Sequence, residues 1–455
     1  MKRSVVLVAL TAALLPERST THLKSPANRS SGRTSKRTFC SIVCIALALG
    51  LLAPLLPLTV AAEDEFAGGD GTSGNPYQVA DWHHLDNVRG HLGDHFILLN
   101  DIDADTDGYA ELAGPSANGG AGWQPIGTDT SRFTGSFDGC RHLVGDLLIN
   151  RGSETGVGLF GVVGAAGSVE RVAVVNCSVY STDEVGGLVG HNYGNLAGNY
   201  ATGSVAGYAN IGGLVGLNRE TVGACYATCD VSAGACGGGL VGQSLGTVAN
   251  CYATGSAQVA VSDSPCGGLV GVNSGTVSNC YATGAVTAGV YMPFDMLGGL
   301  VGRGSGTVSD SFRDTQTSGL SLSCGGTGNT TAKMHDIETF TNTATTGLDS
   351  PWNTVAVVLG ETNPSFTWNI VDGETYPFLS YNRVPPGWTG LWLETGWNMV
   401  SVAKTCTVED FFGDKIEAIY TWDPEGKCCV FPTDLEPYSG YWVAVIKDTT
   451  ILCRF

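Results

Sequence analysis

The segment Gly238-Gly239-Leu240-Val241-Gly242 decides the fold, because near-copies of it recur through the middle of the chain. The same five residues stand at 186–190, 212–216, 267–271 and 298–302, and the variant Val-Gly-Leu-Phe-Gly stands at 157–161. The leucines of successive blocks are separated by 29, 26, 26, 29 and 31 residues. A period in this range indicates a solenoid, in which each repeat forms one coil that contacts only its neighbours.

A second block recurs between the leucines. Residues 246–255 read Gly-Thr-Val-Ala-Asn-Cys-Tyr-Ala-Thr-Gly, residues 275–284 differ from them at one position, and weaker copies stand at 194–203 and 221–228. Each repeat then holds three short strands between Gly, Asn or Ser turns, without the periodicity of an amphipathic helix. We therefore predict an all-β fold, a right-handed parallel β-helix, over residues 151–315.

Equivalent side chains of stacked coils should form columns, because coils lie about 4.8 Å apart. Columns that point inward must be apolar and fill space. One expected inward column is made of leucines: Leu188, Leu214, Leu240, Leu269 and Leu300. A second is made of valines: Val222, Val248, Val277 and Val308. A third is made of cysteines, with Asn199 and Ser311 in the same register: Cys177, Cys225, Cys251 and Cys280.

We interpret the cysteine column as small buried thiols, and two alternatives stay open. Disulfides between adjacent coils satisfy the Cα distance, but parallel side chains fit the required torsion poorly. A metal column would need cysteine or histidine ligands within one coil, and only Cys225 with Cys229 comes near this spacing. Cys236 and Cys266, which both precede the glycine-leucine block on adjacent coils, are better disulfide candidates.

The two alternating blocks resemble the GLUG repeat family over about residues 155–315. Segments 66–77 and 133–139 are similar to the usual opening of such proteins, and 368–379 is similar to the segment that usually ends them. The resemblance implies a bacterial or archaeal exported surface protein, often adhesin-like. Similar repeats also occur beside the catalytic domain of immunoglobulin-A-specific metallopeptidases, so the resemblance leaves an association with an enzyme open.

Residues 1–62 are predicted to be an export segment. A basic stretch at 33–37 precedes an apolar run at 40–60 and then Ala61-Ala62, which is the order of a signal peptide. The run also has the length of a membrane anchor, although Pro54 and Pro57 favour cleavage. We expect an extracellular or cell-surface protein that contacts the membrane only if this segment stays uncleaved.

The remainder of the chain is acidic. Residues 63–455 carry 15 basic and 41 acidic side chains, a formal charge of 15 − 41 = −26. Nucleic acid is not an expected partner, because phosphate binding needs a basic face. The expected partners are other cell-surface components or glycans.

Caps should flank the repeats, because open solenoid ends expose unpaired strands. Residues 63–150 are predicted to form the N-terminal cap and first coils, and residues 316–383 the last coils and the other cap. The linker Val384-Pro385-Pro386-Gly387 precedes residues 387–455, whose aromatic and β-branched segments predict a small β-sandwich.

One segment resembles a calcium loop. Asp103, Asp105 and Asp107 occupy positions one, three and five, and Gly108 occupies position six. Position twelve is Gly114 where a bidentate Glu is required, so an acidic turn is the simpler interpretation. Calcium, if bound, would be structural, and no other cofactor is expected.

Catalytic signatures are sparse. The sequence holds no His-Glu-x-x-His motif and no nucleophile elbow. Asp263 and Asp295 precede the leucines of adjacent coils by six and five residues, so their carboxyls could meet at a loop edge and act on a glycan. We predict a non-catalytic structural or adhesive repeat protein, with a glycan-active β-helix enzyme as the alternative.

Overall fold

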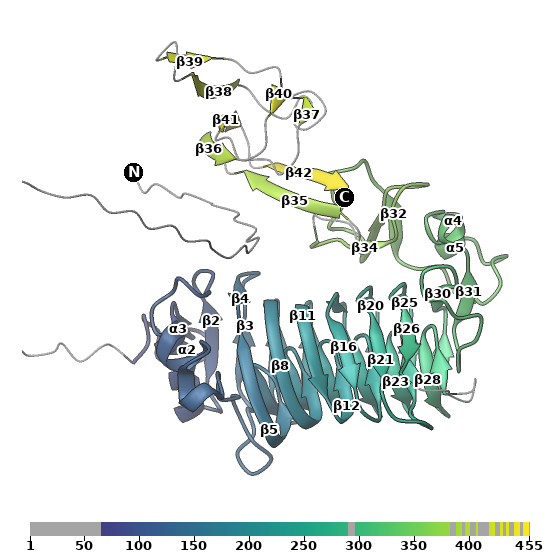
Figure 1. Ribbon diagram of the computed structural model, residues 1–455, viewed down its shortest axis with the longest axis horizontal. Helices are drawn as coiled ribbons and strands as arrows, with labels where there is room; N and C mark the ends of the chain where they lie inside the picture. The colour runs from purple at the N-terminus through teal and green to yellow at the C-terminus, as the bar shows by residue number, and fades with distance from the viewer. Residues whose placement is uncertain are drawn as a thin grey trace, which may run out of the picture.

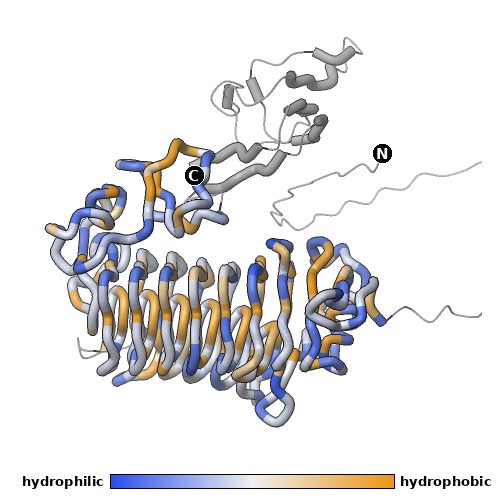
Figure 2. The backbone as a smooth tube through the Cα atoms, turned by 180° about the vertical axis from the view of Figure 1, so that it is seen from behind, coloured by the Kyte–Doolittle hydropathy of each residue, from blue (hydrophilic) through white to orange (hydrophobic). Residues whose placement is uncertain are grey.

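The computed structural model describes residues 65–289 and 296–382, and beyond them the backbone of strands between 388 and 454. The chain forms a parallel β-solenoid whose coils stack side by side along one axis (Figure 1). Apolar segments recur in every coil along this axis (Figure 2). The predicted all-β fold with a parallel β-helix is therefore confirmed. The expected export segment lies outside the described residues.

Three parallel sheets run along the solenoid in the described part of the chain. The first sheet has nine strands, in this order: β1 (Tyr77–Val79), β2 (His95–Leu98), β3 (Ser136–Asp138), β7 (Ser168–Glu170), β10 (Asn195–Ala197), β14 (Thr221–Gly223), β19 (Thr247–Ala249), β24 (Thr276–Ser278) and β29 (Thr307–Ser309). The second has six: β6 (Phe160–Val163), β9 (Val189–Asn192), β13 (Val215–Asn218), β18 (Val241–Ser244), β23 (Val270–Asn273) and β28 (Val301–Gly304).

The third sheet is branched, because up to three successive segments of one coil contribute strands to it. Its first strands are β4 (Leu143–Gly145), β5 (Leu148–Val157), β8 (Ala173–Gly186), β11 (Tyr200–Gly207) and β12 (Ala209–Gly212). It continues with shorter strands: β15 (Tyr226–Ala227), β16 (Asp230–Ala233), β17 (Gly237–Gly238), β20 (Tyr252–Ala253), β21 (Ala257–Val259), β22 (Cys266–Gly267), β25 (Tyr281–Ala282), β26 (Val286–Ala288), β27 (Leu297–Gly298), β30 (Phe312–Asp314) and β31 (Thr327–Asn329).

The core consists of side-chain columns. In the leucine column, the N–H of Leu214 donates to Leu240 O at 2.9 Å, and that of Leu240 donates to Leu269 O at 2.9 Å. The five leucines of the expected column are fully buried. The valine column of the first sheet is preceded by Tyr77, Phe96 and Phe137, so aromatic rings occupy these positions in the first coils.

Glycines of the Gly-Gly-Leu-Val-Gly block permit this stacking. A Cβ on Gly239 would lie 2.1 Å from Gly268 O, and one on Gly268 would lie 2.2 Å from Gly299 O. Neither residue has a positive φ, so close approach between coils, rather than backbone conformation, excludes any larger residue.

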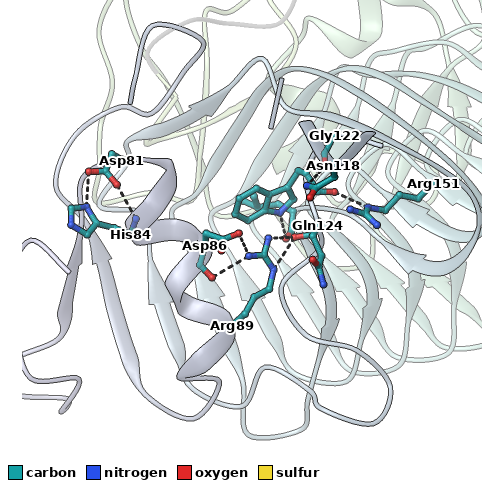
Figure 3. Close-up of polar contacts among 10 residues, drawn as sticks. Asp81, His84, Asp86, Arg89, Asn118, Gly122, Gln124 and Arg151 are labelled. Atoms are coloured by element: carbon teal, nitrogen blue, oxygen red, sulfur yellow. Dashed lines mark hydrogen bonds and ion pairs between the residues drawn. The ribbon is translucent and has the colours of Figure 1, made fainter. Parts of the chain in front are cut away.

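Short helices close the N-terminal end: α2 (Trp82–Asn87), η1 (Val88–Gly90), α3 (Tyr109–Leu112) and η2 (Ala117–Gly120). Arg89 ties them to the first coil, as Figure 3 shows. Its guanidinium lies 4.4 Å from the centre of the Trp123 ring, and its Nη2 donates to Gln124 O at 2.6 Å. Arg151 donates from Nε to Trp123 O at 2.9 Å, so two arginines hold this tryptophan from cap and coil.

The segment after the repeats differs from the prediction. Only β31 continues the stack; the chain then forms α4 (Thr331–Met334), α5 (Glu338–Thr341), β32 (Thr354–Ala356), β33 (Trp368–Ile370) and β34 (Phe378–Leu379). Residues 331–382, the closing segment, fold back along the outside of the solenoid instead of forming further coils. The reason is a ladder of stacked tyrosine rings on the outer surface of the coils, which the closing segment covers and buries.

That ladder is made of one tyrosine per coil. Ring centres lie 4.6 Å apart between Tyr200 and Tyr226, 4.7 Å between Tyr226 and Tyr252, and 5.1 Å between Tyr252 and Tyr281. Trp368 packs against the last two rings at 6.0 and 5.9 Å. The closing segment thereby buries an apolar surface that the coils alone would expose.

Strands beyond residue 387 pair antiparallel: β35 (Trp388–Leu393) with β42 (Thr449–Arg454), β36 (Gly396–Val400) with β41 (Tyr441–Val445), β41 with β38 (Ala418–Asp423), β38 with β39 (Cys428–Val430), and β37 (Cys406–Thr407) with β40 (Asp434–Leu435). Among the described residues, no helix combines the length and apolar character that crossing a membrane requires.

Candidate functional site

The structure places Cys225, Cys251 and Cys280 in one buried column as free thiols. Each thiol is hydrogen-bonded along the stack: the N–H of Cys225 donates to Cys251 Sγ, and that of Cys251 donates to Cys280 Sγ, both at 3.4 Å. Cys251 Sγ also donates to Ala249 O at 3.2 Å. Burial raises the pKa of the Cys251 thiol well above its usual range, so it stays protonated.

Cys177 does not belong to this column, contrary to the prediction. Its place is taken by Val172, whose N–H donates to Asn199 Oδ1 at 2.9 Å. β8 carries one extra residue between Val174 and Cys177, so that Cys177 pairs with Gly203.

The disulfide candidates are not equivalent across coils. Cys266 pairs with Gly237, one position beyond Cys236. Both are buried free thiols, and Cys236 Sγ donates to Gly242 O at 3.4 Å. Because neighbouring positions of a strand point to opposite faces, this offset does not aim the two sulfurs at each other.

The calcium candidate is an acidic turn in the structure. Asp103 Oδ1 accepts hydrogen bonds from Asp105 N and Thr106 Oγ1, both at 3.0 Å. Within residues 65–289 and 296–382, no three His, Cys, Asp or Glu side chains lie together in a way that could hold a metal ion. Asp103, Asp105 and Asp107 thus lie in a hydrogen-bonded turn, and Cys225 and Cys229 are buried free thiols.

One of the two aspartates proposed as a catalytic pair lies among the described residues. Asp263 is an exposed turn residue with a positive φ of 59°. Asp295 lies outside the described residues.

A groove of about 660 Å³ lies across the first coils on the face of the third sheet. It lies where α3 and the turn after β4 meet β5, β8, β11 and the start of β16. Its lining combines short polar side chains with apolar ones: Ala104, Tyr109, Asp146, Leu147, Leu148, Asn176, Cys177, Ser178, Gly203, Ser204 and Asp230.

Hydrogen bonds fix the groove's polar groups in place. Asn176 Nδ2 donates to Asp146 Oδ1 at 2.6 Å, and Tyr109 Oη donates to Asp146 O at 2.9 Å. Asp230 Oδ1 accepts from Ser256 Oγ at 2.6 Å. The groove therefore presents two carboxylates and an amide in ordered positions, a lining suited to hydrogen-bonding a polar ligand.

The groove opens onto an exposed, regular surface, which we call the serine face. Ser178, Ser204 and Asp230 stand opposite one another on β8, β11 and β16. Two residues farther along the same strands, a second column of equivalent positions consists of Tyr180, Ala206, Ser232, Gln258 and Thr287. Sequence reasoning missed this face, because its residues differ from coil to coil and the extra residue in β8 shifts their register.

The coils are 26 to 31 residues long, run parallel and stack through glycine-rich turns and ladders of identical side chains. These features define a β-solenoid repeat protein. The model of the GLUG motif matches residues 267–287. The resemblance to GLUG-motif repeat proteins is thereby confirmed.

Two relatives match part of the chain. The putative Gly-rich membrane protein of Evansella cellulosilytica is 41% identical over 136 residues, which are 28% of this chain and 15% of that protein. Halomucin of Haloquadratum walsbyi is 33% identical over 143 residues, which are 30% of this chain and 2% of that protein. The matched region is thus a small part of each relative.

Among solved structures, a putative immunoglobulin A1 protease from Bacteroides ovatus is similar, with a TM-score of 0.45 and 20% identity over 58% of this chain and 87% of that chain. An IgA1 protease has a TM-score of 0.37 and 15% identity, over 52% of this chain and 19% of that chain.

Proposed function

We propose that the chain is an exported, non-catalytic repeat protein of the cell surface that serves a structural and adhesive role. The observation that carries the proposal is the serine face, where equivalent outward positions, such as Ser204, Asp230 and Ser256, are stacked at the spacing of the coils and carry polar side chains. A surface of stacked, equivalent positions suits contact with an extended partner better than it suits enclosure of a reacting bond.

The construction of the chain supports the same proposal. Its regular sequence positions are occupied by core columns and by the tyrosine ladder, which stiffen the stack. One relative is named as a membrane protein, in agreement with a location at the cell envelope. The net negative charge keeps such a rod soluble and separated from other acidic copies.

Binding to cell envelopes, together with an assay for degradation, tests this function. The purified full chain should bind isolated envelopes saturably and leave a panel of polysaccharides and proteins uncleaved after prolonged incubation. Release of new reducing ends or peptides would overturn the non-catalytic role, and absence of envelope binding would overturn the adhesive one.

A further inference from the structure

We propose that the groove and the serine face together bind a neutral, hydroxyl-rich polysaccharide. This inference rests on the proposed adhesive function and names its ligand class. The binding surface runs from Asp146 and Asn176 in the groove, over Ser204 and Asp230, to two exposed tyrosines, Tyr180 and Tyr208.

The groove supplies hydrogen-bonding groups that are already ordered. Asp146 and Asp230 each accept hydrogen bonds from neighbouring side chains, which use only part of the lone pairs of a carboxylate. The remaining lone pairs can accept from sugar hydroxyls, and the serine hydroxyls can donate or accept. Because these groups are held in place before binding, little side-chain entropy is lost when a ligand arrives.

The two tyrosines supply the apolar contact. Tyr180 is 51% exposed and Tyr208 is 54% exposed, although both rings are large and apolar. Each packs against a glycine: a Cβ on Gly152 would lie 3.2 Å from Tyr180 Cε1, and one on Gly234 would lie 2.5 Å from Tyr208 Cδ2. Glycine therefore fixes each ring in position and leaves the rest of it available to the C–H face of a sugar.

The rings and the groove lie on one sheet. Tyr180 stands two residues beyond Ser178 on β8, and its partner on the next coil is Ala206. Tyr208 follows β11 two residues after Ala206, about 7 Å farther along the strand direction. A chain of sugars can thus contact groove and rings at once, whereas one sugar cannot.

Charge and polarity select the ligand class. The charged side chains in the groove are Asp146 and Asp230, so polyuronates, sulfated glycans and nucleic acids would be repelled. A protein partner would need a charge-depleted apolar centre, and this surface offers two separate rings among serines. A neutral glycan can donate hydrogen bonds from its hydroxyl groups to the two carboxylates and place its C–H face against the tyrosine rings. It carries no charge that the carboxylates would repel.

The test is affinity measurement by calorimetry with the full chain. The probes are a neutral glucan, a neutral mannan and a polyuronate of similar length, each at low and high salt. We expect a neutral polymer to bind with a Kd that salt hardly changes, because no ion pair is formed. Tyr180→Ala and Tyr208→Ala should each weaken binding about tenfold, as loss of an aromatic anchor does.

A matched control comes from another side of the solenoid. Leu245 is 41% exposed and precedes β19 of the first sheet, so Leu245→Ala removes an exposed apolar side chain and should leave the Kd unchanged. Asp230→Asn keeps the side-chain size and should weaken binding to the neutral polymer. Circular dichroism should be identical for all four variants, because the substitutions are at exposed positions.

The contrary outcomes separate the two proposals. Binding of only the polyuronate, or salt-sensitive binding of a basic protein to this face, would overturn the ligand class. Glycan binding that survives both tyrosine substitutions would overturn the site and leave adhesion intact. Envelope binding without glycan binding would overturn this inference alone, and loss of both would overturn the proposed function as well.

Discussion

The backbone N–H of Cys251 donates a hydrogen bond to Cys280 Sγ, 3.4 Å away in the next coil. The same bond recurs one coil earlier from Cys225 to Cys251, and one coil later the acceptor is Ser311 Oγ, 3.1 Å from Cys280 N. Cysteine therefore acts here as a hydrogen-bonding residue as much as an apolar one, which explains why serine and asparagine occupy the ends of the column.

Cys251→Ser should be nearly neutral, whereas Cys251→Ala should be destabilising. Serine keeps an acceptor for Cys225 N–H and a donor for Ala249 O. Alanine removes both; Ala249 O keeps its hydrogen bond from Ala224 N, but the buried N–H of Cys225 is left unpaired, at a cost of about 1–3 kcal/mol in the free energy of unfolding. Urea unfolding of the two variants checks this. If alanine is tolerated as well as serine, the thiol acts through packing alone.

Thiol accessibility should divide the cysteines of residues 65–289 and 296–382 into two groups. Cys140 and Cys324 are exposed, while the ladder cysteines are fully buried and burial raises the pKa of Cys251 well above its usual range. Iodoacetamide should therefore label the two exposed cysteines in the native chain, and the ladder only after unfolding. Peptide mass spectrometry measures the rates. Disulfide-linked ladder peptides in the native protein would contradict the free-thiol column.

The closing segment depends on Trp368. This residue is fully buried, its ring centre lies 4.9 Å from that of Trp352, and its Nε1 donates to Asn250 Oδ1 at 3.3 Å. Trp368→Ala should cost about 3–5 kcal/mol and make residues 331–382 sensitive to limited proteolysis, while the coils stay intact. Val358→Ala, at a position 69% exposed on the same segment, is the control and should change neither property. Simultaneous digestion of the coils would show that the segment is not a separate layer.

The fold was predictable from the sequence because each coil repeats its core residues at a fixed spacing. The leucine and valine columns follow from this spacing alone. Cys177 was misplaced because its residue type was weighted above its spacing: it precedes Asn199 by only 22 residues, whereas Val172, which holds the column position, precedes Asn199 by 27.

The closing segment was missed for a different reason. A tyrosine follows the cysteine position in successive coils, at Tyr226, Tyr252 and Tyr281, and this regularity was the available signal that an outward ladder exists. The sequence does not say which distant residues cover it: the contact from Tyr381 Oη to Ala224 O spans 157 residues. The groove was missed because its lining combines single residues from several coils.

Ala224 is a site for stabilisation. Each coil turns before the cysteine column at a residue with positive φ, which is 55° at Asn250, 52° at Asn279 and 49° at Ala224. Asparagine tolerates this conformation, whereas alanine pays about 1 kcal/mol for it. Ala224→Asn should therefore raise the free energy of unfolding by about 1 kcal/mol. Thermal or urea unfolding measures this.

The reciprocal substitution controls for it. Asn279→Ala places alanine at the equivalent turn and should lower the free energy of unfolding by about the same amount. Equal stability of all three chains would mean that the backbone relaxes at this turn.

The N-terminal cap should weaken as pH rises. His91 Nε2 lies 2.8 Å from Glu65 Oε1 and its Nδ1 lies 3.0 Å from Asp94 Oδ2. The hydrogen bond to Glu65, followed by that to Asp94, raises the pKa of His91 above 6.5. A raised pKa means that the folded state binds the proton more tightly, so the stabilisation is complete below the pKa of the unfolded chain, near 6.5, and is lost as pH rises through the folded value. Because Glu65 is 64% exposed, the effect should be less than about 1 kcal/mol.

Hydrogen exchange of the cap amides, measured below and above this range, should show faster opening at the higher pH. His91→Asn should remove this pH dependence, whereas Glu65→Gln should only reduce it, because Asp94 still raises the pKa of His91. The double variant should remove no more than His91→Asn alone. An unchanged pH profile in His91→Asn would assign the effect to another group.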